Sequence, residues 1–180
     1  ASNTVISELH YHTPDPSAVE MTEGYTDEEE FEFVEIANIH PVNEVDLTNV
    51  SFTDGVIFTF PFGTTLAPGE RILVVSNQAA FEFRYGNGVG VIAGSYTGNL
   101  RNSGEHVRLE AADDLAIADF TYGEESEWPL SADGDGYSLV FSGSDPGHGP
   151  DWRSSVGLGG NPGGSDAVSL GGGDLFAYAL

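Results

Sequence analysis

The feature that most constrains the fold is a series of short apolar runs, each closed within a few residues by a turn signal. Within several runs apolar and polar residues alternate, which is the period of a β-strand with one buried face. The turns use Gly, Pro and Asp, and Asp54-Gly55 is the strongest hairpin dipeptide among them. No long run repeats apolar residues at helical spacing. Such closely spaced strands and turns predict an all-β sandwich or barrel.

Two segments depart from the strand pattern. Residues 77–85 are expected to form one or two helical turns, with Asn77 as the N-cap and Gly86 at the end. Residues 17–30 are polar and are expected to form a solvated loop. The expected strands are residues 5–12, 31–37, 45–47, 50–52, 56–60, 71–75, 89–93, 107–110, 116–122 and 137–141.

The apolar fraction of 39% is sufficient for a core. The two tryptophans are expected to be large buried anchors, each with its indole N–H against a carbonyl. The residues expected to be mostly buried are Ile6, Leu9, Val34, Ile36, Phe58, Leu73, Val75, Val107, Leu109, Phe120, Leu139, Trp128 and Trp152.

A length of 180 residues fits one compact domain with loops and a tail. Residues 157–173 are dominated by Gly, Ser and Asp, and buried apolar surface cannot offset the entropy of ordering them. We therefore expect one domain over residues 1–163, with its boundary near Pro162. Residues 164–180 are expected to be a Gly-rich linker or the start of a following segment. Residues 174–180 are apolar again, and could instead be a strand that folds back onto the sandwich.

The charge balance restricts the partners. The chain has 29 acidic residues against five basic ones, all Arg, for a formal net charge of −24. This surface repels phosphate backbones and anionic membranes, so no nucleic-acid partner is expected. The acid excess is typical of salt-adapted proteins, although it could simply keep an exported protein soluble. The chain has no Cys and no stretch near the ~20 apolar residues that span a bilayer, so neither disulfides nor membrane insertion are expected.

Several segments together, in this order and spacing, resemble the lamin tail domain family. The most specific is Leu-Arg-Asn-Ser-Gly-Glu-His-Val-Arg-Leu at residues 100–109. Residues 5–9, 33–38, 58–61 and 65–70 resemble the opening strands and hairpin of the family. Residues 119–122, 128–129, 134–139, 152–154 and 161–163 resemble its bacterial branch, so the resemblance extends from about Val5 to Gly163.

The resemblance implies an immunoglobulin-like β-sandwich without catalytic residues. Bacterial domains of this kind look like modules of exported multidomain proteins, which implies an extracellular or cell-surface location. The nuclear role of animal lamins is not transferred, because the chain has no coiled-coil rod, basic localisation patch or lipidation motif. The isolated domain is expected to be monomeric and not an enzyme.

Candidate metal ligands occur in three places. Glu8, His10 and His12 share one face of the first expected strand and could bind zinc, or could be ordinary rim residues. The acidic loop and the Asp-Gly repeat at residues 133–136 could supply calcium oxygens, although the repeat fails the EF-hand template and fits a hairpin turn. The calcium candidates are Asp27, Glu28, Glu29, Glu30, Asp133 and Asp135. We expect that the chain requires no cofactor, and calcium is the ion that it could bind.

Two functions from different classes are open. One is a structural, adhesive or docking module with a protein partner, and the other is a carbohydrate-binding module, which could depend on calcium. Phe62, Phe81, Phe83 and Tyr96 are aromatics in expected loops. An exposed flat trio of these rings favours sugar binding, whereas scattered buried rings favour a scaffold. Residues 86–90 are Gly-rich, but they lack the strand and helix that flank a dinucleotide-binding loop, so a plain loop is expected.

Overall fold

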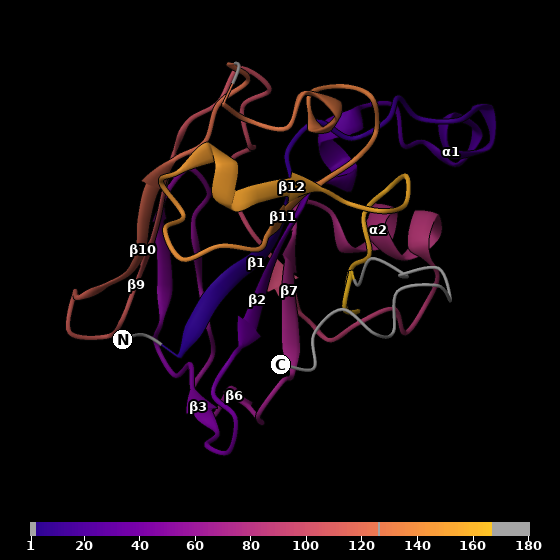
Figure 1. Ribbon diagram of the computed structural model, residues 1–180. Helices are drawn as coiled ribbons and strands as arrows, with labels where there is room; N and C mark the ends of the chain where they lie inside the picture. The colour runs from indigo at the N-terminus through magenta and orange to yellow at the C-terminus, as the bar shows by residue number, and fades with distance from the viewer. Residues whose placement is uncertain (1–2, 126, 167–180) are drawn as a thin grey trace, which may run out of the picture.

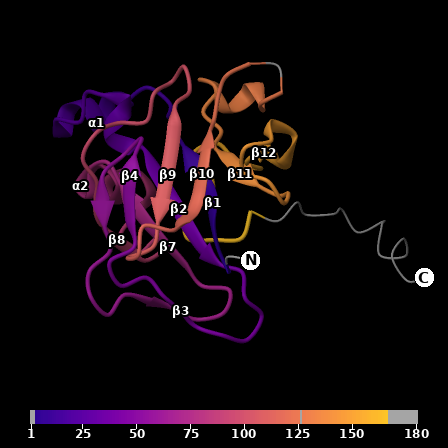
Figure 2. The same cartoon turned by 90° about the vertical axis from the view of Figure 1, so that its left-hand side faces the viewer.

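The computed structural model describes residues 3–125 and 127–166, and shows two β-sheets packed face to face (Figures 1 and 2). The larger sheet has the strand order β12-β11-β1-β2-β7-β8, and only β7 and β8 are parallel. Its strands are β1 (Thr4–His10), β2 (Phe33–Asn38), β7 (Arg71–Val75), β8 (Ile92–Ser95), β11 (Leu139–Phe141) and β12 (Trp152–Ser154).

The smaller sheet has the order β10-β9-β4-β5 and is antiparallel throughout. A separate two-stranded ribbon of β3 and β6 lies at the lower end in Figure 1. The bounds are β3 (Val45–Asp46), β4 (Ser51–Asp54), β5 (Phe58–Thr59), β6 (Thr65–Leu66), β9 (His106–Glu110) and β10 (Ala116–Thr121). The predicted immunoglobulin-like β-sandwich is confirmed.

The main core fills the space between the two sheets. Eleven of the thirteen residues expected inside are buried, and Phe58 and Trp128 are partly buried against them. Trp152 lies near the rings of Phe120 and Phe141, and its indole N–H donates to the Pro146 carbonyl at 2.9 Å. Trp152 is therefore the anchor that the sequence predicted.

A β-bulge in β1 decides which side chains enter this core. Ile6 is opposite Ile36 and Glu8 is opposite Glu35, so Ser7 is an extra residue in the ladder. The bulge places Ile6 in the main core and Glu8 on the outer face of the larger sheet. A strict alternation along residues 5–12 misses this change of face.

The outer face of the larger sheet is covered by a helix. Helix α2 (Gln78–Tyr85) begins at Asn77, whose side chain accepts the N–H groups of Ala79 and Ala80, and it ends at Gly86. Phe81 packs from it against Phe33 of β2 in a second, smaller core. The predicted helical turns and N-cap are confirmed, and Glu35 is buried on this second side of the sheet.

The expectation of a solvated loop over residues 17–30 is wrong. The segment contains helix α1 (Ala18–Glu23) and a 3₁₀ helix (Glu28–Phe31), each with a capping box. Ser17 with Glu20 forms the first box and Asp27 with Glu30 the second, which is the spacing that starts a helix. Two further 3₁₀ turns are Leu130–Ala132 and Gly149–Asp151, and no helix in the described residues is long and apolar enough to cross a membrane.

Residues 157–166, here called the strap, cross the outer face of the larger sheet. The backbone N–H groups of Asn161 and Gly163 donate to the carboxylates of Glu8 and Glu35, and Pro162 is buried. The strap is thus ordered by polar ties, which low apolar content does not predict. The domain boundary near residue 163 stays a prediction, and residues 167–180 lie outside the described part of the chain.

Candidate functional site

Glu35 is the first of two carboxylates that hold the strap. It lies on β2 with a fully buried side chain. The Ser7 hydroxyl donates to its Oε1 at 2.6 Å, the Arg71 guanidinium forms an ion pair with it, and the Gly163 N–H donates to Oε2 at 2.7 Å. The carboxylate therefore joins β1, β2, β7 and the strap.

Glu8 is the second of these carboxylates and faces Glu35 across the β1–β2 ladder. The Ser138 hydroxyl donates to its Oε1 at 2.5 Å and the Asn161 N–H at 2.9 Å. Burial raises the pKa of Glu8 to about 7, and the neighbouring Glu35 carboxylate adds to the increase. Within this pair of acids, Glu35 is the one that forms an ion pair with Arg71.

Glu32 forms a third buried tie, on the N-terminal side of β2. Its Oε2 accepts the Tyr96 hydroxyl and the Leu100 N–H, both at 2.9 Å, which joins β2 to residues 96–100. Its Oε1 is buried and has no hydrogen-bond partner in the described structure. Burial raises the pKa of Glu32 to about 9, so the neutral carboxylic acid is the stable form at neutral pH.

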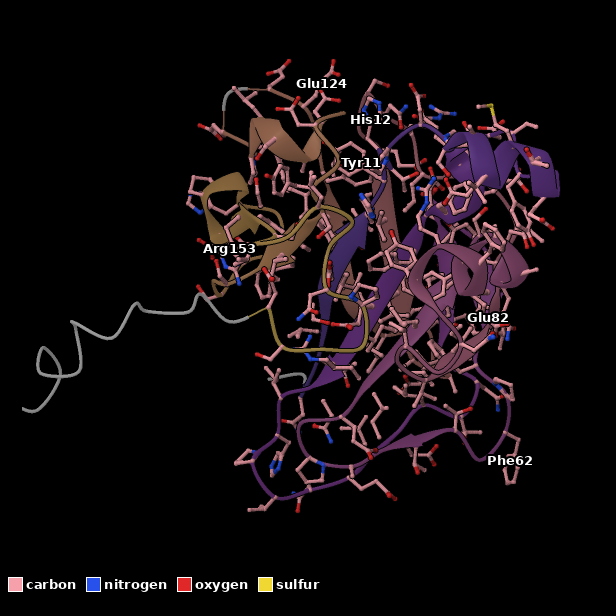
Figure 3. All side chains as sticks on the ribbon, turned by 90° about the vertical axis from the view of Figure 1, so that its right-hand side faces the viewer. Tyr11, His12, Phe62, Glu82, Glu124 and Arg153 are labelled. Atoms are coloured by element: carbon pink, nitrogen blue, oxygen red, sulfur yellow. The ribbon has the colours of Figure 1, made fainter. Side chains whose placement is uncertain are left out.

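The contacts of Glu8, His10 and His12 do not support the zinc interpretation. His10 is fully buried and its Nδ1 lies 3.3 Å from the Tyr85 hydroxyl, while Glu8 is bound to the strap. His12 lies beyond β1, with its Nδ1 2.9 Å from Asp133 (Figure 3). Across residues 3–125 and 127–166, no group of three or more His, Asp or Glu side chains is placed to hold a metal ion.

The calcium candidates of the acidic loop each accept hydrogen bonds from protein N–H groups. Asp27 accepts the N–H of Glu29, as the second N-cap. The others accept from side-chain amides: Glu28 from Asn102 at 2.8 Å, Glu29 from Asn99 at 3.0 Å, and Glu30 from Asn77 at 2.9 Å. The acidic loop is therefore tied to residues far along the chain.

The structure brings one residue of each candidate calcium loop to the same histidine. Glu28 Oε1 is 3.9 Å and Asp133 Oδ1 is 2.9 Å from ring nitrogens of His12. Asp135 is exposed on the turn that follows. Calcium binding by any of these carboxylates stays a prediction.

The four aromatics considered for sugar binding separate into two pairs. Phe81 and Tyr96 are buried, so no exposed trio forms from these four rings. The expectation that all four lie in loops is wrong for Phe81 and Phe83, which belong to α2. Phe62 is 90% exposed at one end of the molecule (Figure 3). Phe83 on α2 is 42% exposed, and its ring lies beside that of Tyr25. Phe81 belongs to α2 and packs into the second core. The helix expected over residues 77–85 was the sequence signal that could have predicted its burial.

All five arginines form ion pairs within the chain. Arg84 binds Glu20 of α1 at 2.7 Å with little exposure of either side chain. The remaining pairs are Arg71 with Glu35, Arg101 with Glu105, Arg108 with Glu110 and Asp119, and Arg153 with Asp166. The chain has no lysine, so its positive side chains are these arginines and any protonated histidines. Each arginine is paired with a carboxylate of the same chain.

The outer face of the smaller sheet has a charged row that sequence reasoning missed. His106 of β9 lies between two carboxylates, 2.9 Å from Asp54 on β4 and 2.6 Å from Asp119 on β10. These hydrogen bonds raise the pKa of His106, so its protonated form is stabilised. Residues this far apart in the sequence can be recognised as neighbours only when the register of the sheet is known.

An apolar groove of about 450 Å³ opens along the seam between the sheets, beside β10 (Figure 2 shows β10 at the edge of the smaller sheet). Ile117 and Ala118 of β10 form one wall, and Val5 and Ile6 of β1 form the other. Phe141 and the loop after it close the groove at the side of β11. We call it the β10 groove. None of the described residues that line it carries a charged side chain.

The match to a family model covers residues 1–124 and is to the Lamin Tail Domain. The chain belongs to the lamin tail domain family. This is a family of non-enzymatic immunoglobulin-like interaction domains, which fits the packing of the two sheets. Comparisons with curated proteins and with solved structures gave no match. Strands β11 and β12 follow the matched residues in sequence, yet in this lamin tail domain they complete the larger sheet, because β11 pairs with β1 and β12 pairs with β11.

Proposed function

We propose that this lamin tail domain is a non-catalytic interaction module of an exported multidomain protein, from the bacterial branch of the family. The observation that supports it most is the use of its buried acids. Glu8, Glu32 and Glu35 accept hydrogen bonds from backbone N–H groups of distant segments, so they act as ties in the scaffold. A scaffold tied in this way presents a fixed surface, which suits docking.

The composition supports an exported, salt-adapted location at a microbial surface. The chain combines 29 acidic residues with no lysine. Such a surface favours solubility where salt screens the charges. The partner that we propose is a protein.

A carbohydrate partner is the alternative. Phe62 and Phe83 are exposed and could stack on sugar rings, but Phe81 and Tyr96 are buried and supply no third platform. Binding to a glycan array that is lost in both Phe62→Ala and Phe83→Ala would favour this alternative over the protein partner.

The native full-length polypeptide provides the test. Deletion of residues 1–166 should abolish association with the protein partners of the polypeptide and leave the activity of its other domains unchanged. Cell fractionation should place the polypeptide outside the cytoplasm. An unchanged set of partners after the deletion, or loss of a catalytic activity that purified residues 1–166 restore, would contradict the proposal.

A further inference from the structure

Strand β10 has an outer edge that pairs with no strand in the described part of the chain. On its other edge, the N–H of Tyr122, just after the strand, donates to the Glu105 carbonyl at 3.1 Å. Alternate residues of a strand direct their backbone groups to opposite edges. The N–H and C=O groups of Asp119 and Thr121 therefore face outward, where a further strand would bind them.

The β10 groove lies where the side chains of that further strand would enter. Ala118 and Phe120 are the buried residues of β10, and Ala118 lines the groove. A strand added next to β10 would turn every second side chain toward the same interior. The groove between β10 and β1 thus has the position of a missing edge strand, with room for a bulky apolar side chain.

The charges around the groove indicate what sort of strand fits. Asp113 and Asp114 lie in the turn that leads into β10, and Asp145 lies between two residues of the groove wall. Every arginine already has a carboxylate partner, as described above. A second copy of a chain with a net charge of −24 would be repelled, whereas a basic segment would be attracted.

We propose that the β10 edge binds an extended segment of a basic partner protein, which adds a strand to the smaller sheet and inserts an apolar side chain into the β10 groove. Main-chain hydrogen bonds to Asp119 and Thr121 supply affinity, and the groove supplies specificity. The inference rests on the proposed function as an interaction module and assigns the surface and the partner class.

Thr121 permits a sharp test, because its N–H faces the edge of β10 that pairs with no described strand. Thr121→Pro removes the outward N–H, which an edge strand tolerates. Thr121→Val keeps the N–H and is the matched control. The probe is the capped heptapeptide Lys-Val-Lys-Ile-Lys-Val-Lys, with an acidic version (Glu for Lys) and a version with alternate amides N-methylated. Binding to residues 1–180 is followed by nuclear magnetic resonance, with hydrogen exchange of the Asp119 and Thr121 amides.

The basic peptide should slow exchange of both amides at least tenfold. Its affinity should fall at least tenfold in Thr121→Pro and stay within twofold in Thr121→Val. The acidic and N-methylated peptides should bind at least tenfold more weakly, which tests the edge even if Thr121→Pro fails to fold. Equal binding of the basic and N-methylated peptides would overturn the proposal.

Two other occupants give distinct results that also overturn it. Protection of both amides in the free chain that is lost on deleting residues 167–180 would assign the edge to the chain itself. Protection that grows with protein concentration would assign it to a second copy. If the peptide fails while deletion of residues 1–166 from the native polypeptide still abolishes partner association, the edge proposal alone is wrong.

Discussion

At the scale of single residues, the buried acids couple the fold to pH. Glu8 and Glu32 have folded-state pKa values of about 7 and about 9, above the ordinary value of 4.5. The folded state then holds protons that the unfolded chain has released, so their contribution to stability is full below pH 4.5. This contribution to stability is lost as the pH rises, through 7 for Glu8 and through 9 for Glu32.

His10 acts with the opposite sign. Burial lowers its pKa from 6.5 to about 3, so its neutral form is stable in the fold. Its contribution is full above pH 6.5 and is lost as pH falls toward 3. From these three groups we expect the free energy of unfolding to be highest at about pH 4.5. Urea titrations from pH 4 to 9 measure it, and a maximum at or above pH 7 would contradict the assignment.

Glu32 alone can be tested in a narrow window. Between pH 7.5 and 8.5 the unfolded chain has lost the Glu32 proton and the fold retains it, so stability should fall by about 1.4 kcal/mol. Glu32→Gln removes the titration and should abolish most of this fall. Glu23→Gln, at an exposed residue of α1, is the matched control and should keep the wild-type slope. Equal slopes in the two variants, by urea unfolding, would exclude Glu32 as the source.

Trp152 should be the costliest side chain to truncate. It is 3% exposed and lies near the rings of Phe120, Trp128 and Phe141. Trp152→Ala should reduce the free energy of unfolding by about 3–5 kcal/mol through lost transfer energy and a cavity. Leu158→Ala, at a residue 68% exposed, should change it by less than about 0.5 kcal/mol. An unchanged melting temperature in Trp152→Ala would refute this role.

At the scale of elements, local patterns predicted most strands and failed where long-range contacts decide. Alternation located β9 and β10, because each has one buried face, and short apolar runs located β2 and β7, which are buried on both faces. The change of face in β1 follows from a bulge, which exists only relative to β2. The three-residue strand β12 is too short to show a period, and its pairing with β11 defines it.

The candidate sites show the same division. Helix α1 had a local signal, since Ser17 and Glu20 have capping-box spacing, but the acidity of the segment concealed it. The three buried acids, by contrast, have no local signal: Glu8 and Glu35 become neighbours through sheet register, and Glu32 meets Leu100 across 68 residues. The edge of β10 also follows only from the strand order.

The strap can be tested through its glycines. Gly160 has a φ of +79°, and an added Cβ would overlap the Glu8 carboxylate and approach the Ser138 hydroxyl. Gly160→Ala should therefore destabilise the strap by about 1–3 kcal/mol. Gly157→Ala, in the same strap, is the control: its Cβ would make only an ordinary contact, 3.9 Å from the Gly160 carbonyl oxygen, and stability should change by less than about 0.5 kcal/mol. Hydrogen exchange should speed up at Asn161 and Gly163 in Gly160→Ala only, and protected amides there would contradict the tie.

At the scale of the whole molecule, the dominant feature is unbalanced charge. Five arginines can neutralise at most a few of 29 acidic residues, and the structure shows these arginines already paired. Carboxylates on neighbouring loops therefore repel one another over distances comparable to the Debye length, about 8 Å at physiological ionic strength. Unfolding separates these charges, which favours the unfolded chain at low salt.

Salt should consequently stabilise the domain, and the cause can be separated from specific calcium binding. Screening should raise the melting temperature progressively up to molar sodium chloride and should persist in chelator. Calcium bound by the acidic loop or by Asp133 and Asp135 should raise it at millimolar concentration and lose the effect in chelator. Thermal unfolding at low salt, at molar salt, and at low calcium with and without chelator measures both.

Asp27→Asn and Asp133→Asn should reduce only a calcium-specific increase, because each removes one of the candidate ligands while changing the net charge by a single unit. A melting temperature that stays constant across all conditions would mean that the acidic surface is balanced locally, and the inference of salt adaptation would be wrong.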